Sequence, residues 1–129
     1  MTEWTVVAIA DPIDDECELF DWLITRSGWE ARRLRPGRPQ DVAAQIGEVH
    51  AATVLHRTWP NHAGVPLLRA LRASPATAKI PVLVVTTDPR SDRLDAALRA
   101  GASSVLLLPT EPFELVAELK RLMDQARGR

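Results

Sequence analysis

The chain has little cysteine and no long apolar run, and these gaps narrow the class of protein. Cys17 is its only cysteine among 129 residues, so an internal disulfide is excluded, which fits a reducing compartment. Every apolar stretch is far shorter than the roughly 20 residues that a membrane-spanning helix needs. The N-terminus lacks a basic region followed by an apolar stretch, so no secretion signal is expected. These features predict a cytoplasmic protein.

An excess of charge of either sign is also lacking. Lys and Arg number 16 against 17 Asp and Glu, so nothing electrostatic favours nucleic acid as a direct partner. Apolar residues make up 46% of the chain, as in a folded domain and unlike a disordered one. The length fits one domain. We expect that domain to cover residues 1–125, with residues 126–129 as a tail or the start of a linker.

Short apolar runs alternate with segments of helical periodicity along the whole chain. The expected strands cover residues 4–10, 29–34, 51–56, 80–85 and 105–107. The expected helices cover residues 14–26, 40–49, 64–73, 90–100 and 111–125. This alternation predicts an α/β fold with a parallel sheet and helices on both faces. Five strands favour the flavodoxin-like, doubly wound (βα)5 order 2-1-3-4-5.

The first expected helix carries two further predictions. Asp14 is a plausible N-cap, because its side chain can accept a hydrogen bond from the first turn. Cys17 and Phe20 lie on the expected inward face, and Leu19 and Trp22 are expected to widen it.

The third expected strand delivers a histidine, His56, to its carboxyl end. In open parallel sheets this edge is where ligands bind and chemistry takes place. The fifth strand ends at Leu108 and Pro109 and delivers no polar side chain to the same edge. The two strand ends together predict a site that has lost its reactive groups.

Three segments resemble the receiver domain of bacterial two-component response regulators. Residues 80–86 look like that family's fourth strand with its terminal Thr or Ser, and residues 100–104 look like the turn before its fifth strand. Residues 60–72 match its third loop and helix, and the order of these segments extends the resemblance to nearly the whole chain. The resemblance implies a CheY-like signalling domain.

The resemblance also implies where a phosphorylation site would lie. The family's phosphoacceptor Asp, four residues before a proline, corresponds here to His56, and its Lys corresponds to Leu108. The retained switch residue is Thr86, and Val105 replaces an aromatic that often rotates on activation. These matches imply a pseudo-receiver that lacks both the acceptor Asp and the Lys.

The acidic pair with which the family holds magnesium is also incomplete. Asp11 and Pro12 occupy its two positions, or, after a shift of one residue, Ala10 is its second member and Asp11 follows it. At most one acid of the pair is retained, and one carboxylate is a poor cage for magnesium. Without an acceptor carboxylate, a metal or a fixed cation, phosphoryl transfer to Asp is not expected. We therefore expect no enzyme activity, no cofactor and no bound metal.

His56 also admits other interpretations. It could be a phosphate acceptor or a metal ligand, although a metal needs several donors. It could line a pocket for a small ligand, or titrate as a pH sensor. The simplest interpretation, which we favour, is a partly buried imidazole bonded to nearby backbone.

Four acidic residues near the first helix also invite a metal-site hypothesis. They are Asp11, Asp14, Asp15 and Glu16. The favoured interpretation is stabilisation of the helix N-terminus, because these four cannot all point at one ion.

The expected function is therefore phosphorylation-independent protein contact in a two-component-type system, with a regulator, kinase or effector domain as partner. Trp59 is a candidate contact residue, or it folds over the vacated pocket. Arg90, Arg93 and Val105 lie on or beside the surface of helix four, strand five and helix five, through which the family often forms dimers. Whether this chain dimerises there is open.

Overall fold

The computed structural model describes residues 5–46, 50–56 and 64–127, and structural statements below refer to these ranges. Five parallel strands form one sheet in the order β2-β1-β3-β4-β5, which confirms the predicted topology. The strands are β1 Val6–Ala10, β2 Glu30–Arg33, β3 His50–His56, β4 Val82–Thr86 and β5 Ser104–Leu107. Trp4, Trp59 and Pro60 lie outside the described residues.

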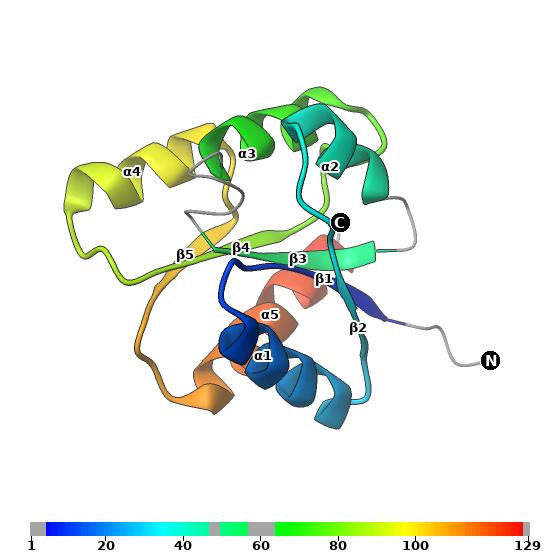
Figure 1. Cartoon of the computed structure of the whole chain (residues 1–129), viewed down its shortest axis with the longest axis vertical. Helices are drawn as coiled ribbons and strands as arrows, with labels where there is room; N and C mark the ends of the chain where they lie inside the picture. The colour runs from blue at the N-terminus through cyan, green and yellow to red at the C-terminus, as the bar shows by residue number, and fades with distance from the viewer. Residues whose placement is uncertain (1–4, 47–49, 57–63, 128–129) are drawn as a thin grey trace.

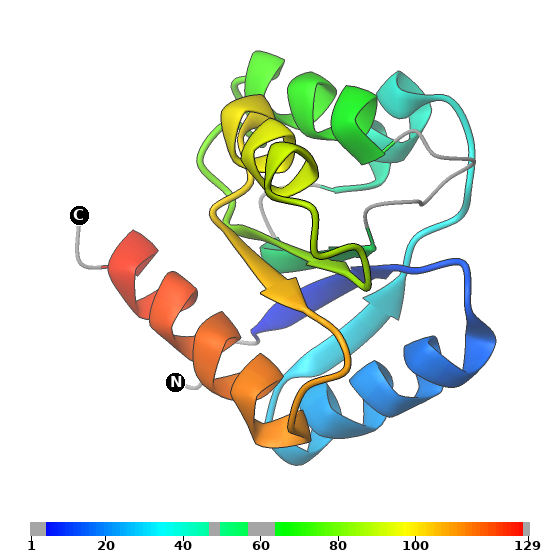
Figure 2. The same cartoon turned by 90° about the vertical axis from the view of Figure 1, so that its left-hand side faces the viewer.

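Helices cover both faces of this sheet. They are α1 Asp14–Arg26, α2 Pro39–Gln45, α3 Gly64–Ala73, α4 Ser91–Ala100 and α5 Pro112–Arg127. In Figure 1, α1 and α5 lie below the sheet and the other three helices lie above it. Figure 2 shows the same three-layer arrangement from the side. No helix among the described residues has the length and apolarity to cross a bilayer.

The central strands contribute side chains to two hydrophobic cores, one on each face of the sheet. Along β1, Ala8 and Ala10 pack in the core beneath α2, α3 and α4, whereas Val7 and Ile9 pack in the core against α1 and α5. This alternation follows from the two-residue period of a strand. All five residues of β1 are buried, as expected of a parallel strand covered on both faces.

Two predictions for α1 are wrong. Asp14 is the first helical residue, and Ile13 holds the N-cap position without a side-chain cap; the Ile13 N–H instead donates to Oδ1 of Asp11 at 2.8 Å. Leu19 and Trp22 are exposed, because α1 shares its face of the sheet with α5 and buries only a narrow stripe. At the other end of the chain, α5 continues through Arg127, two residues beyond its predicted end.

Candidate functional site

The strand register brings Asp11 and His56 to one level of the sheet. Ala10 pairs with Leu55 across β1 and β3, so the residues that follow them, Asp11 and His56, come together at the carboxyl edge. Both side chains are nearly buried, with exposed fractions of 7% and 6%. The predicted position of His56 at the end of a buried strand is confirmed.

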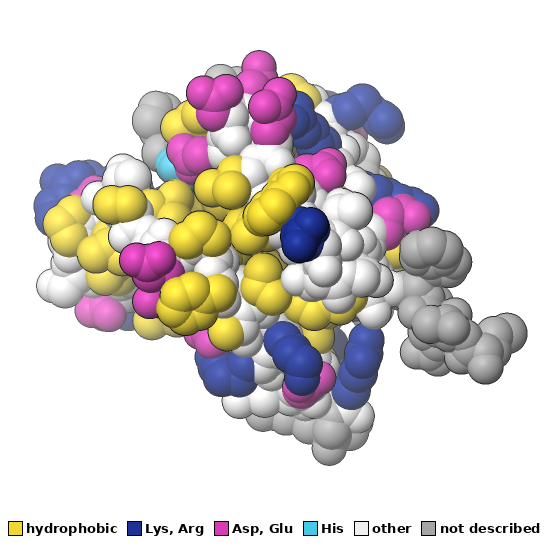
Figure 3. Space-filling view, turned by 90° about the horizontal axis from the view of Figure 1, so that it is seen from below, with side chains coloured by type: hydrophobic (Ala, Val, Ile, Leu, Met, Phe, Trp, Pro, Cys, Tyr) yellow, Lys and Arg dark blue, Asp and Glu magenta, His cyan; other side chains and the backbone are white. Residues whose placement is uncertain are grey.

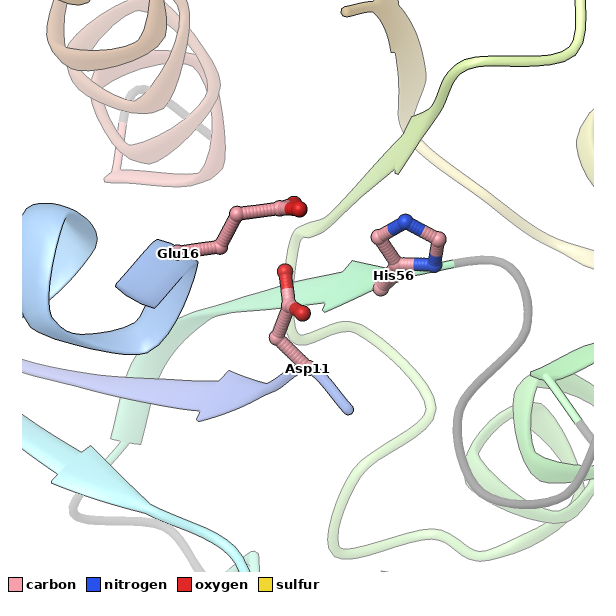
Figure 4. Close-up of side chains that lie close together, drawn as sticks. All are labelled: Asp11, Glu16 and His56. Carbon is pink, nitrogen blue, oxygen red and sulfur yellow. The ribbon is translucent and has the colours of Figure 1, made fainter. Parts of the chain in front are cut away.

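Glu16 joins these two residues from the first turn of α1. One donor atom each from Asp11, Glu16 and His56 lies within 4.8 Å of the other two. Figure 4 shows the two carboxylates and the imidazole ring converging from β1, α1 and β3. Glu16 thus supplies a second carboxylate beside Asp11, although the favoured interpretation assigned it to the helix N-terminus. Asp14 and Asp15 are exposed, so only Glu16 of the acidic helix start enters the site.

The two carboxylates carry unsatisfied hydrogen-bonding capacity. Oδ2 of Asp11 and Oε1 of Glu16 are buried and receive no hydrogen bond from the described residues. Burial, and next the negative charge of Asp11 and a hydrogen bond to it, raise the pKa of Glu16 to about 7. A proton on Glu16 turns one of its oxygens into a donor toward Asp11. This proton both satisfies an acceptor and removes the repulsion between the two negative charges. The pair therefore favours a proton, or another cation, between its two carboxylates.

Cys17 lies below this pair but is not part of its donor set. Its Sγ donates to the backbone carbonyl oxygen of Asp11 at 3.3 Å. Burial, followed by the charge of Asp11, raises the pKa of the Cys17 thiol, so it stays protonated at neutral pH. The role of Cys17 is therefore structural.

The ends of β4 and β5 complete the edge without adding charge. Thr86 is buried, and its Oγ1 accepts a hydrogen bond from the Asp88 N–H at 3.1 Å. The Leu108 N–H donates to the carbonyl oxygen of Thr86 at 2.7 Å. The Leu108 side chain packs against the core on the α1 and α5 side. The position implied for a Lys thus holds a partly buried apolar side chain that packs against the core.

The predicted surface residues have varied surroundings. Arg90 forms an ion pair of 2.7 Å with Asp88 in the loop after β4. Arg93 is exposed, whereas Val105 is partly buried against the core beneath α4. Trp59 lies outside the described residues, so its predicted contact stays a prediction.

One surface was not anticipated as a patch. Trp22 on α1 and Phe113 on α5 are 56% and 67% exposed and line a shallow groove together with Pro112 and Val116. Figure 3 shows apolar side chains gathered on this side of the molecule. An available signal was the number of large apolar residues on α1, which exceeds what one narrow buried stripe accommodates.

Known proteins resemble this chain in both sequence and fold, although no family model matches it. It is 27% identical to the transcriptional regulatory protein GltR of Pseudomonas aeruginosa over 124 residues, covering 94% of this chain and 50% of GltR. It is also 27% identical to the response regulator PleD of Caulobacter vibrioides over 117 residues, covering 90% of this chain and 25% of PleD. The chain thus spans half or less of the length of these relatives.

Solved structures agree with the sequence likeness. A Chloroflexus aurantiacus protein assigned as a response regulator superposes with a TM-score of 0.84 at 26% identity, over 94% of this chain and 98% of its own. These likenesses strongly support a CheY-like receiver domain. The receiver domain of the sensor histidine kinase PA1611 from P. aeruginosa, with magnesium in its active-site cleft, shares the fold at a TM-score of 0.81 and 16% identity, over 94% of this chain and 98% of its own. The carboxyl edge of the sheet in this chain holds Asp11, Glu16 and His56.

Proposed function

We propose that this chain is an atypical receiver domain that signals by protein contact without phosphorylation of an Asp. It acts in a two-component-type system in the cytoplasm, without an enzymatic activity of its own. Its partner is a regulator, a kinase or an effector domain. The single observation that carries the proposal is the pairing of an intact receiver fold with His56 at the end of β3.

The chemistry of the strand ends supports this proposal. An acyl phosphate requires a carboxylate nucleophile, and the imidazole of His56 does not supply one. Phosphoryl transfer further depends on cations that spread the developing negative charge. Leu108 places an apolar side chain where the resemblance implies a Lys, and this side chain packs against the core. Phosphotransfer through His56 and small-ligand sensing receive no support from the comparisons.

Phosphate labelling provides the first test. The purified chain is incubated with radiolabelled acetyl phosphate and magnesium, beside a receiver domain that has an acceptor Asp. We expect label on that control and none on this chain. Base-labile label on this chain would contradict the proposal. Label that survives base, is lost in acid and disappears in His56→Ala would instead establish phosphotransfer through the imidazole.

Partner binding provides the second test. Proteins recovered with the chain from a lysate of its own source are identified, purified and titrated by calorimetry, with and without acetyl phosphate. We expect the same Kd, within about twofold, under both conditions. A Kd that improves tenfold or more with acetyl phosphate would show that phosphorylation controls the contact.

The contact surface is tested with one variant on each side of the molecule. Trp22→Ser alters the exposed apolar face of α1 and α5, and Leu107→Glu alters the exposed end of β5. We propose the α1 and α5 face as the partner surface, because its two aromatic side chains are exposed and adjacent. Trp22→Ser should then weaken partner binding, while Leu107→Glu leaves it unchanged.

Homodimerisation through α4, β5 and α5 is a separate proposal. Leu98 and Leu107 expose apolar surface on these elements, while Glu118 is already paired with Arg121 and Ser104 of the same chain. Sedimentation velocity of the wild type and of Leu107→Glu tests it. A concentration-dependent dimer that the variant abolishes would support the interface, and a monomer at every concentration would exclude it.

A further inference from the structure

We propose that Asp11, Glu16 and His56 form a binding site for one divalent transition-metal ion, with zinc as the reference ion. The inference stands on the geometry of the strand ends and does not rest on the proposed signalling function. It revises the expectation of no metal, which counted Asp11 as the one retained acid of the pair and assigned Glu16 to the helix N-terminus.

The three donors come from three separate segments that the fold holds together. Asp11 follows β1, His56 ends β3 and Glu16 lies in the first turn of α1. Two atoms that bind the same zinc ion at about 2.1 Å each lie at most about 4.2 Å apart. The donor atoms already lie within 4.8 Å of one another. Rotation of the longer and less buried Glu16 side chain closes the remaining gap.

The unsatisfied oxygens point independently to a cation. Oδ2 of Asp11 is buried within a side chain that is only 7% exposed, and it receives no hydrogen bond from the described residues. Oε1 of Glu16 is likewise buried and receives no hydrogen bond from the described residues. Two neighbouring anionic acceptors in a site of low dielectric are costly unless a positive charge lies between them.

The donor set does not suit magnesium, the ion that the receiver fold implies. Magnesium selects oxygen ligands in near-octahedral geometry and is held through carboxylates and water. The two carboxylates meet this need, but the third donor is the imidazole nitrogen of His56, which is not a ligand that magnesium prefers. Imidazole nitrogen suits zinc, cobalt and nickel, and these ions also accept carboxylate oxygen.

The coordination is three protein ligands with at least one position left for water. Three protein donors and an open position are common in zinc sites that exchange ligands. Cys17 does not add a fourth donor, because its Sγ donates to the backbone carbonyl oxygen of Asp11 and lies outside the donor cluster. Asp14 and Asp15 are exposed and lie outside the cluster.

The test measures metal binding directly on the chelator-treated, full-length chain. Zinc is titrated by calorimetry, and cobalt is titrated by visible absorption, which reports the coordination geometry. We expect one saturable site, a cobalt spectrum with nitrogen and oxygen ligands, and a raised Tm with zinc. Magnesium at millimolar concentration should raise the Tm little.

Variants assign the site to its residues. His56→Ala and Asp11→Asn should each weaken zinc binding at least tenfold, since each removes one of three ligands. Asp15→Asn serves as the matched control, because its carboxylate is exposed one position before Glu16. His50→Ala and His62→Ala control for binding at the other two histidines. Circular dichroism verifies that each variant is folded.

Three results would overturn the inference. The first is no saturable zinc or cobalt binding by the wild-type chain, which needs no variant to interpret and would leave the proton as the only cation of the pair. The second is binding that persists unchanged in both His56→Ala and Asp11→Asn. The third is magnesium that binds as tightly as zinc, which would show that the imidazole does not select the ion.

Discussion

The two edges of the sheet differ in whether the chain satisfies the hydrogen bonds of its polar side chains. At the amino edge, near the starts of β4 and β5, the half-buried guanidinium of Arg72 donates to carbonyl oxygens of Gly101 at 2.8 Å, Ala78 at 3.1 Å and Ile80 at 2.6 Å. At the carboxyl edge, buried oxygens of Asp11 and Glu16 receive no hydrogen bond from the described residues.

The difference separates a structural cluster from a binding site. A charged donor that is satisfied by several carbonyl groups of its own chain stabilises the fold and has no spare capacity for a ligand. Acceptors that the chain leaves unsatisfied lower the stability of the empty protein and favour any cation that fits. The four predictions below test this contrast between the edges, from the largest expected effect to the smallest.

Arg72→Ala should give the largest effect. It removes several charge-assisted hydrogen bonds and leaves partly buried carbonyl groups without this donor, so we expect a loss of about 2–4 kcal/mol in the free energy of unfolding. Urea denaturation followed by circular dichroism measures it. Arg69→Ala, on the exposed side of the same helix, is the control and should change little. If both variants lowered the free energy of unfolding equally, the hydrogen bonds of Arg72 at the amino edge would not be what stabilises the fold.

Gly101→Ala tests how closely Arg72 packs at the amino edge. Gly101 ends α4 with a φ of +116°, and a Cβ there would lie 2.5 Å from Cγ of Arg72. Strain and displacement of Arg72 should together cost about 1–3 kcal/mol of unfolding free energy. Gly37→Ala is the matched control, because its added Cβ meets only ordinary contacts at 3.8 Å. A neutral Gly101→Ala would mean that this edge readily rearranges.

Glu16→Gln should raise the free energy of unfolding, unlike the two substitutions at the amino edge. With chelator present at pH 8, it removes the half-buried negative charge beside the buried carboxylate of Asp11, and we expect a gain of about 1 kcal/mol in unfolding free energy. Because the pKa of Glu16 is raised to about 7, its carboxyl binds more protons in the folded than in the unfolded state. Stability of the wild type relative to the variant should therefore fall as pH rises from about 4.5 to 7 and then level off.

Urea denaturation at a series of pH values measures this difference between wild type and Glu16→Gln. Glu18→Gln is the control, because Glu18 is exposed on the same helix. A difference that does not change with pH, or a variant less stable than the wild type at pH 8, would show that the carboxyl edge is satisfied after all.

Arg90→Ala should have the smallest effect. Its ion pair with Asp88 lies in the loop beyond the carboxyl end of β4, and water screens the charge of the exposed Arg90 side chain. We expect no measurable change in the urea midpoint, in contrast to Arg72→Ala. A clear loss of stability would show that Arg90 at the carboxyl edge stabilises the fold as Arg72 does at the amino edge.

Much of the fold was predictable from local pattern. Apolar runs with a two-residue period and apolar positions with a helical period identified all five strands and helices, and the handedness of crossovers limited their order. The position of His56 at a strand end followed from the same reasoning. The exposure of Trp22 did not, because it depends on how two helices divide one face of the sheet.

The sequence alone determined the residue types at the strand ends: His56 where an acceptor Asp is implied, Leu108 where a Lys is implied, and a single acid, Asp11, after the first strand. Tertiary structure decided that Glu16 turns toward Asp11 and His56, while its neighbours Asp14 and Asp15 face solvent. The reason is geometric. Strand spacing predicts which ends meet at an edge, but the side chain that a helix directs at them depends on how that helix is rotated against the sheet.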